Sequence, residues 1–128
     1  MDKVIDLMDG VNVVLLNGEL GAGKTTFSRF LIRSLIRNQK LKVLSPTFSV
    51  VNLYSSDQIN IAHFDCYRIT TPQELYEIGI EEFLATHICI VEWPETVLNN
   101  FLKDISFVDI TIESTDEKDE RMLAVCKS

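Results

Sequence analysis

The chain has 128 residues, 46% of them hydrophobic and 24% charged, which are the proportions of a soluble protein with a single domain, residues 1–128. Its net charge of −7 argues against a protein that grips nucleic acid by the phosphates, because such proteins carry a basic surface. Three widely spaced cysteines without a CxxC pair argue against a disulfide framework and a zinc site. The longest early apolar stretch, 13–16, is too short for a signal peptide or a membrane span, so we expect a cytoplasmic protein.

The first third of the chain predicts a strand, a helix and a second extended segment. Residues 11–16 (VNVVLL) are apolar and β-branched, which is typical of a strand buried on both faces. Residues 25–37 carry apolar side chains at helical spacing and predict a helix. The apolar segment 42–44 ends at Ser45-Pro46, and the proline excludes a helix there. These elements predict a β–α–β order.

The middle of the chain predicts a hairpin followed by two short helices. Residues 49–54 and 59–64 read as strands joined by a polar turn. Pro72 opens a helix that Thr70 or Thr71 caps, and Gly79 breaks it before a further turn or two over 80–84.

The last third predicts strands only. Residues 88–91 form a buried strand that Trp93-Pro94 ends, and 105–112 pairs antiparallel with 121–126. We therefore expect an α/β fold in which helices flank one mixed, mainly parallel sheet.

A phosphate-binding loop joins the first strand to the first helix. Residues 18–25 (GELGAGKT) match G-x-x-x-x-G-K-[ST] at every fixed position. The glycines let successive N–H groups turn inward around an anion, and the helix that follows presents its positive dipole end to the same anion. Lys24 can reach the β- and γ-phosphates, and the Thr25 hydroxyl lies where Mg²⁺ binds. The loop predicts nucleotide binding.

Two carboxylates follow predicted strands and are candidates for the magnesium site. Glu92 comes directly after the strand ICIV, and Asp65 follows the strand IAHF. A loop of this kind needs an acid at the end of a neighbouring strand to hold the metal. One of the two would be a metal ligand and the other would position the attacking water, and the sequence leaves open which does which.

Missing motifs narrow the class of nucleotide-binding protein. The sequence has no N-K-x-D signature of a GTPase, no arginine-rich lid of a nucleoside kinase and no L-S-G-G-Q segment of a transporter ATPase. A minimal ATPase that acts on or through another protein remains.

A basic stripe lies along the predicted helix and just beyond it, formed by Arg29, Arg33, Arg37, Lys40 and Lys42. It is either a solvated helix face or a docking surface for an acidic partner or an RNA.

Four segments in this order resemble one family. They are NGELGAGKTTF (17–27), SPTFSVVNLY (45–54), HFDCYRI (63–69) and VEWPE (91–95), and ELYEIGIEEFL (74–84) adds to them. Together they are similar to TsaE, the small ATPase of the bacterial pathway that places threonylcarbamoyl on adenosine 37 of tRNA. The resemblance covers nearly the whole chain. It implies a P-loop NTPase-like fold, ATP and Mg²⁺ as cofactors, the TsaD–TsaB complex as partner, and contact with tRNA only through that complex.

The resemblance also implies roles for individual residues. Thr25 and Glu92 would be magnesium ligands, Asp65 would organise water or metal near the γ-phosphate, and Thr47 would sense that phosphate. Together with Lys24, these acids and Thr47 form the expected catalytic set. The residues expected to contact the nucleotide are Glu19, Leu20, Gly21, Ala22, Gly23, Lys24, Thr25, Thr26, Trp93 and Arg121.

Further positions and alternative functions stay open at the level of sequence. His63, Tyr67 and Arg68 would serve switching, partner docking or structure. Cys66 stands where the family usually has leucine, and the short segment before Asn17 leads us to expect weak adenine recognition. The competing functions are a small-molecule kinase and a non-catalytic module gated by nucleotide.

Overall fold

One mixed sheet forms the middle of the molecule. The computed structural model describes residues 2–19, 23–46, 50–94, 96–114 and 121–127. The strands are β1 (Val13–Asn17), β2 (Val51–Ser55), β3 (Asn60–Asp65), β4 (Ile88–Glu92), β5 (Val108–Ser114) and β6 (Arg121–Lys127). They lie in the order β2-β3-β4-β1-β5-β6. Strands β3, β4, β1 and β5 are parallel to one another, and β2 and β6 pair antiparallel at the two edges. The predicted mixed, mainly parallel sheet is confirmed.

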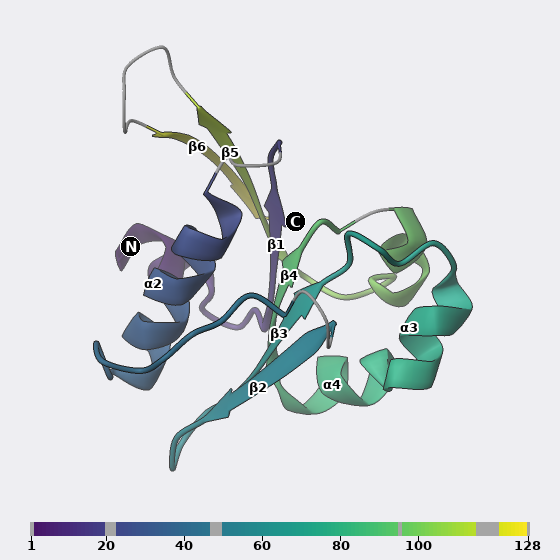
Figure 1. Cartoon of the computed structure of the whole chain (residues 1–128), viewed down its shortest axis with the longest axis horizontal. Coiled ribbons are helices and arrows are strands. Elements are labelled where there is room, and N and C mark those ends of the chain that lie inside the picture. Colours follow the sequence, from purple (N-terminus) through teal and green to yellow (C-terminus); the bar gives the residue numbers. More distant parts are fainter. Residues whose placement is uncertain (1, 20–22, 47–49, 95, 115–120, 128) are drawn as a thin grey trace.

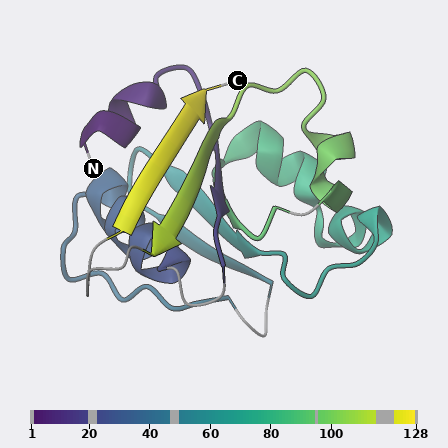
Figure 2. The same ribbon diagram turned by 90° about the horizontal axis from the view of Figure 1, so that it is seen from above.

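Helices cover both faces of the sheet. They are α1 (Asp2–Leu7), α2 (Lys24–Ile36), α3 (Pro72–Ile78), α4 (Ile80–Thr86) and the 3-10 helix η1 (Thr96–Phe101). Helix α2 lies on one face, and α3 and α4 lie on the other (Figure 1). The view from above shows the same separation, with the N-terminal helix on the side of α2 (Figure 2). No helix in the described parts of the chain is long and apolar enough to cross a membrane.

Strand β1 is buried on both faces, as its apolar sequence predicts. Val14 and Leu16 pack in the cluster that holds α2, with Leu31 and Ile32 among its members. Val13 and Leu15 pack in the other cluster, against the side chains of β3, α3, α4 and η1. Alternate residues of a strand point to opposite faces, so an apolar run of this kind needs a helical layer on each side.

The link between the two short helices follows the sequence prediction. Thr71 caps α3, and the Glu74 carboxylate accepts a hydrogen bond from the Thr71 N–H at 3.1 Å. Gly79 has φ 94° and ends α3 while it begins α4, a conformation that favours glycine. Cys66 and Cys89 are buried, and burial raises the pKa of the Cys89 thiol to about 12.

Three features differ from the sequence prediction. Residues 41–46 form neither helix nor strand, although Val43 is buried in the α2-side cluster. Side chains of β2 hold this segment instead: Asn52 Nδ2 donates to the Leu44 carbonyl at 3.1 Å, and the Tyr54 hydroxyl accepts from the Leu44 N–H at 3.2 Å. Helices α1 and η1 were not predicted, because each is only six residues long and depends on the core that it helps to cover.

Candidate functional site

The phosphate loop begins where β1 ends in the middle of the sheet. Gly18 follows the strand, and Gly23 has a left-handed backbone with φ 101° directly before Lys24 opens α2. A side chain at Gly23 would be strained in this conformation. Strand, loop and helix thus follow one another as the motif predicts. Leu20, Gly21 and Ala22 lie outside the described residues.

The Lys24 side chain folds back onto the first residues of the phosphate loop. Its Nζ donates to the carbonyls of Gly18 at 2.7 Å and Glu19 at 2.9 Å, and the side chain is only 5% exposed. The same Nζ lies 3.8 Å from the centroid of the Trp93 ring, within the range of a cation–π contact. The ammonium group is therefore kept at the loop by neutral partners, which a phosphate can replace.

The two candidate acids lie next to each other at the carboxyl ends of neighbouring parallel strands. Asp65 ends β3 and Glu92 ends β4, and they are direct partners in the register of the pair. The adjacent β1 places Leu16 opposite Glu92, so the phosphate loop starts at Gly18, two residues after that level. The sheet order β3-β4-β1 thereby brings both carboxylates to the loop, as the sequence predicts.

Glu92 binds the helix as well as the sheet. Its Oε1 accepts a hydrogen bond from the Thr25 hydroxyl at 3.0 Å. Its Oε2 accepts from the Ser28 hydroxyl at 3.2 Å and from Nε2 of His63 at 2.5 Å. A carboxylate oxygen accepts hydrogen bonds, so Nε2 of His63 carries the proton. The carboxylate is 2% exposed, which makes this cluster a buried polar centre between α2, β3 and β4.

Burial in the site shifts the pKa of two ionisable groups. Desolvation lowers the pKa of the Lys24 ammonium, and the negative charges of Glu92 and Asp65 oppose that shift. Desolvation also raises the pKa of the Asp65 carboxyl, and the charge of Glu92 adds to this, whereas the hydrogen bond from the Tyr67 N–H acts in the opposite direction. Asp65 is therefore a stronger proton acceptor than an ordinary aspartate.

Trp93 lies between Glu92, which it follows in the chain, and Lys24 of the phosphate loop, which its ring contacts. It follows Glu92 in a left-handed backbone conformation with φ 58°, and its N–H donates to the Leu16 carbonyl at 3.2 Å. Its ring packs against Tyr67 at a centroid distance of 4.8 Å and also contacts the Lys24 ammonium group. A bulky side chain with positive φ is strained, and such strain gathers at functional sites.

Trp93 is the only tryptophan of the chain, so its emission can report on Lys24. We expect ATP with Mg²⁺ to change the fluorescence in a saturable way, because phosphates draw the Lys24 ammonium away from the indole ring. Adenosine, which lacks phosphates, is the control and should leave the emission unchanged. Unchanged emission with ATP, while calorimetry registers binding, would contradict this assignment.

The remaining predicted residues are placed as follows. Thr26 and Glu19 are exposed, and Thr47 and the side chain of Arg121 lie outside the described part of the chain. His63 is fully buried, which excludes partner docking for it, whereas Tyr67 and Arg68 are exposed.

The sequence prediction did not include Ser28. Its hydroxyl could have been recognised from the spacing, because it comes three residues after Thr25 and so lies on the helix face that packs against the sheet.

The oxygen donors fit Mg²⁺. In the described residues no three His, Cys, Asp or Glu side chains are arranged to hold a metal ion on their own. Magnesium needs no such set, because it is usually bound by one or two protein oxygens together with substrate phosphates and water. The Thr25 hydroxyl and the Glu92 carboxylate, 3.0 Å apart, supply hard oxygens of this kind beside the loop.

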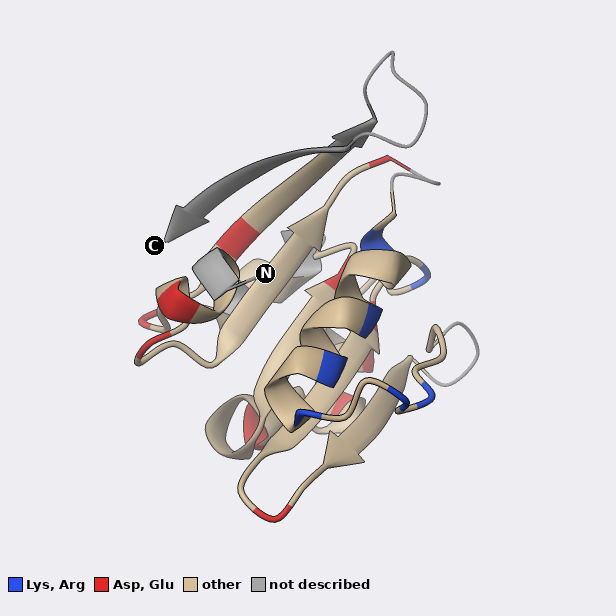
Figure 3. Cartoon of the chain, turned by 90° about the vertical axis from the view of Figure 1, so that its left-hand side faces the viewer, with Lys and Arg blue, Asp and Glu red and all other residues tan. Residues whose placement is uncertain are grey.

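The basic stripe lies along α2 and the segment after it. Figure 3 shows the lysines and arginines of this region on one side of the molecule. One of them has a structural contact, since Nε of Arg33 donates to the Leu41 carbonyl at 2.8 Å and ties the segment to the helix. Arg37, Lys40 and Lys42 are exposed. A docking role for the stripe stays a prediction.

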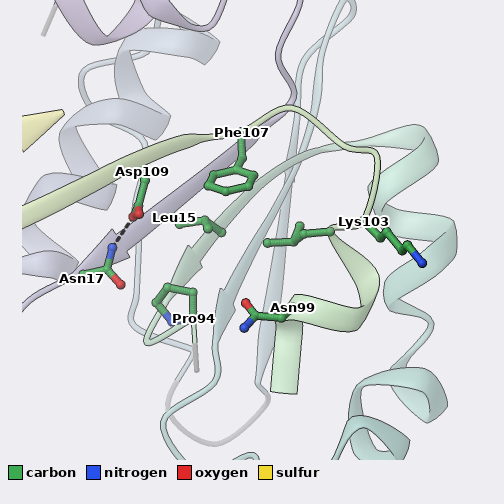
Figure 4. A pocket seen from close by; sticks show the side chains of 8 residues that line it. Leu15, Asn17, Pro94, Asn99, Lys103, Phe107 and Asp109 are labelled. Atoms are coloured by element: carbon green, nitrogen blue, oxygen red, sulfur yellow. Dashed lines mark hydrogen bonds between the residues drawn. The ribbon is translucent and has the colours of Figure 1, made fainter. Parts of the chain in front are cut away.

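A separate pocket of about 410 Å³ lies on the face away from α2 (Figure 4). Asn17 and Asp109 lie on one side, where the Asn17 amide donates to the Asp109 carboxylate, Asn99 and Lys103 lie on the other side, and Phe107 lies between them. Asn17 directly precedes the phosphate loop. The pocket therefore adjoins the start of the loop but lies apart from the Glu92 cluster.

Comparisons with known proteins agree with the motifs. The family model for "Threonylcarbamoyl adenosine biosynthesis protein TsaE" matches residues 1–123. A Rickettsia typhi protein named tRNA threonylcarbamoyladenosine biosynthesis protein TsaE is 36% identical over 107 residues, which are 84% of this chain and 74% of that relative. A Rickettsia prowazekii protein of the same name is 43% identical over 86 residues, which are 67% of this chain and 59% of that relative.

A solved structure supports the fold. The crystal structure of Bacillus subtilis YdiB matches with a TM-score of 0.62 and 24% identity, over 91% of this chain and 68% of that one. At this identity the likeness concerns the fold alone. The family model, in contrast, matches almost the whole sequence. The chain belongs to the TsaE family of threonylcarbamoyl adenosine biosynthesis proteins.

Proposed function

We propose that this chain hydrolyses ATP as an accessory subunit of the machinery that makes N6-threonylcarbamoyladenosine at position 37 of tRNA. The observation that carries the proposal is the 3.0 Å hydrogen bond between Thr25 and Glu92. It joins the phosphate loop to the strand-end acid in a member of the TsaE family. Hydrolysis needs both parts in one site, since the loop binds the phosphates and the acid holds the metal.

Each residue of the site has a part in this mechanism. Lys24 exchanges its carbonyl partners for the β- and γ-phosphates and balances their charge. Thr25 and Glu92 would hold Mg²⁺, which when bound neutralises charge that develops on the phosphates. Asp65 lies beside Glu92, and its raised pKa suits a group that orients the attacking water and accepts its proton.

The partner we propose is the TsaD–TsaB complex in the cytoplasm. The net charge of −7 supports contact with tRNA through a protein and not directly. An ATPase of this kind couples hydrolysis to the state of its partner, so slow turnover in isolation is expected. The matched segments span only part of the two Rickettsia relatives, and the partner assignment depends on the family.

A small-molecule kinase is the second candidate, and the pocket beside Asn17 favours it. The pocket has the size of a ligand site and is lined by polar as well as apolar side chains. A kinase would consume ATP only when an acceptor is present. Steady release of phosphate from ATP in water alone would therefore count against the kinase.

Reconstituted tRNA modification tests the proposal. Purified TsaD and TsaB, with tRNA and a threonylcarbamoyl donor, are incubated with this chain, without it, or with Lys24→Ala. We expect sustained formation of modified nucleoside only with the unaltered chain, as measured by mass spectrometry of digested tRNA. Equal yield in the absence of the chain would refute the accessory role, and lack of phosphate release with and without the partners would refute the ATPase.

A further inference from the structure

The two oxygens of Glu92 have different surroundings. Oε2 receives two buried donors, Nε2 of His63 at 2.5 Å and the Ser28 hydroxyl at 3.2 Å. Oε1 receives the Thr25 hydroxyl at 3.0 Å, and Thr25 belongs to the phosphate loop. A carboxylate oxygen has about two lone-pair sites for acceptance. The contacts therefore fill Oε2 from inside the protein and leave room at Oε1, on the side of the loop.

A histidine at position 63 destabilises the fold unless its contact with the Glu92 carboxylate compensates. It is 0% exposed, on the face of β3 that carries Asp65, and its Nδ1 has no hydrogen-bond partner in the described part of the chain. A buried ring nitrogen without a partner destabilises the fold, and an apolar side chain would fill the same space without that penalty. The contact of Nε2 with Glu92 is the interaction that an apolar residue could not supply.

A carboxylate held in this way can offer a cation one oxygen but not both. Magnesium is small, prefers octahedral geometry and takes carboxylates through single oxygens, whereas calcium is larger and readily accepts both oxygens of one carboxylate. We propose that His63 and Ser28 pin Oε2 of Glu92 and so make the site select Mg²⁺ over Ca²⁺. Both are positioning residues that act through Glu92. The inference rests on the proposed function only in assuming that nucleotide binds together with a divalent cation.

Calorimetric titration of ATP into the chain tests this selectivity. Affinity is measured with Mg²⁺, with Ca²⁺ and with EDTA, for the unaltered chain and for four variants. His63→Phe and Ser28→Ala each remove one donor to Oε2. His63→Gln keeps an N–H donor at the position of Nε2, and Ser34→Ala is a matched control further along α2. Thermal melting of each variant accompanies the titrations.

We expect Mg²⁺ to strengthen ATP binding more than Ca²⁺ does in the unaltered chain, in His63→Gln and in Ser34→Ala. His63→Phe and Ser28→Ala should lower the Mg²⁺-to-Ca²⁺ affinity ratio by about tenfold, the scale found when groups that orient a metal ligand are removed. Their affinity for ATP in EDTA should stay within about twofold, because the loop and Lys24 are untouched.

An unchanged ratio in a folded Ser28→Ala or His63→Phe would overturn the inference while nucleotide binding stands. Ser28→Ala leaves little empty space, so it decides the question if His63→Phe does not fold. If the unaltered chain binds no ATP under any condition, the proposed function fails and the inference falls with it. Binding with the expected selectivity but without hydrolysis would refute the ATPase and leave the inference intact.

Discussion

Lys24→Ala is expected to weaken ATP binding by about a hundredfold. In the free chain Nζ of Lys24 is bound to the carbonyls of Gly18 and Glu19, and phosphate oxygens would replace these neutral acceptors with charged ones. Charge-assisted hydrogen bonds contribute about 1.5–3 kcal/mol each, and loss of about 3 kcal/mol corresponds to roughly a hundredfold change in Kd. Calorimetric titration of ATP measures the effect.

The same change should not destabilise the fold. Lys24 is 5% exposed and desolvation lowers the pKa of its ammonium group, so alanine removes a charge whose burial is unfavourable. The melting temperature should stay the same or rise. Lys40→Ala removes an exposed lysine and serves as the control of equal charge. ATP binding by Lys24→Ala as tight as by Lys40→Ala would show that the phosphates bind elsewhere.

Glu92→Gln is expected to lower kcat for ATP hydrolysis by about a hundredfold while ATP still binds. The carboxylate supports the metal that stabilises charge in the transition state, and loss of about 3 kcal/mol of that stabilisation gives this factor. Affinity for ATP in EDTA should stay the same or increase, because a negative charge near the phosphates is removed. Phosphate release at saturating ATP and titration in EDTA separate the two effects.

Glutamine suits this test because it nearly preserves the shape of the side chain. Glu92→Ala would leave the Ser28 hydroxyl and Nε2 of His63 without their shared acceptor, and the fold itself could change. Glu82→Gln on the exposed side of α4 is the matched control. Hydrolysis by Glu92→Gln at the rate of Glu82→Gln would exclude Glu92 from the metal site.

Asp65→Asn resolves the roles of the two acids. If Asp65 positions water, the variant loses turnover at every Mg²⁺ concentration, whereas Glu92→Gln is partly restored by excess Mg²⁺. The reverse pattern would assign the metal to Asp65. The two side chains end neighbouring strands at the same register, so the backbone alone does not distinguish them.

Local sequence signals were sufficient for much of the fold. Strand β1 could be recognised because a run buried on both faces is apolar throughout, and the α3–α4 break because Gly79 adopts a backbone that other residues avoid. Helix α1 could not be predicted in this way. Its six residues are stabilised by the burial of Val4, and of Met8 directly after the helix, in a core that exists only after the sheet has formed.

The site shows the same division between local and long-range information. Lys24, Thr25 and the strand-end position of Glu92 follow from spacing along the chain. The contact of His63 with Glu92 does not, because it joins residues 29 positions apart and requires β3 and β4 to be neighbours in a particular register. The sequence left a switching, a docking and a structural role open for His63, and its burial excludes docking.

The register of β3 and β4 limits where the chain can gain or lose residues. Both acids are positioned by strands, and α3 and α4 lie between them in the sequence. The segment between Ile69 and α3 can therefore change length without displacing either carboxylate. Deletion of a single residue between His63 and Asp65 would instead turn Asp65 to the opposite face of the sheet, away from the phosphate loop. Length variation among relatives should accordingly be tolerated after Ile69 and avoided within β3.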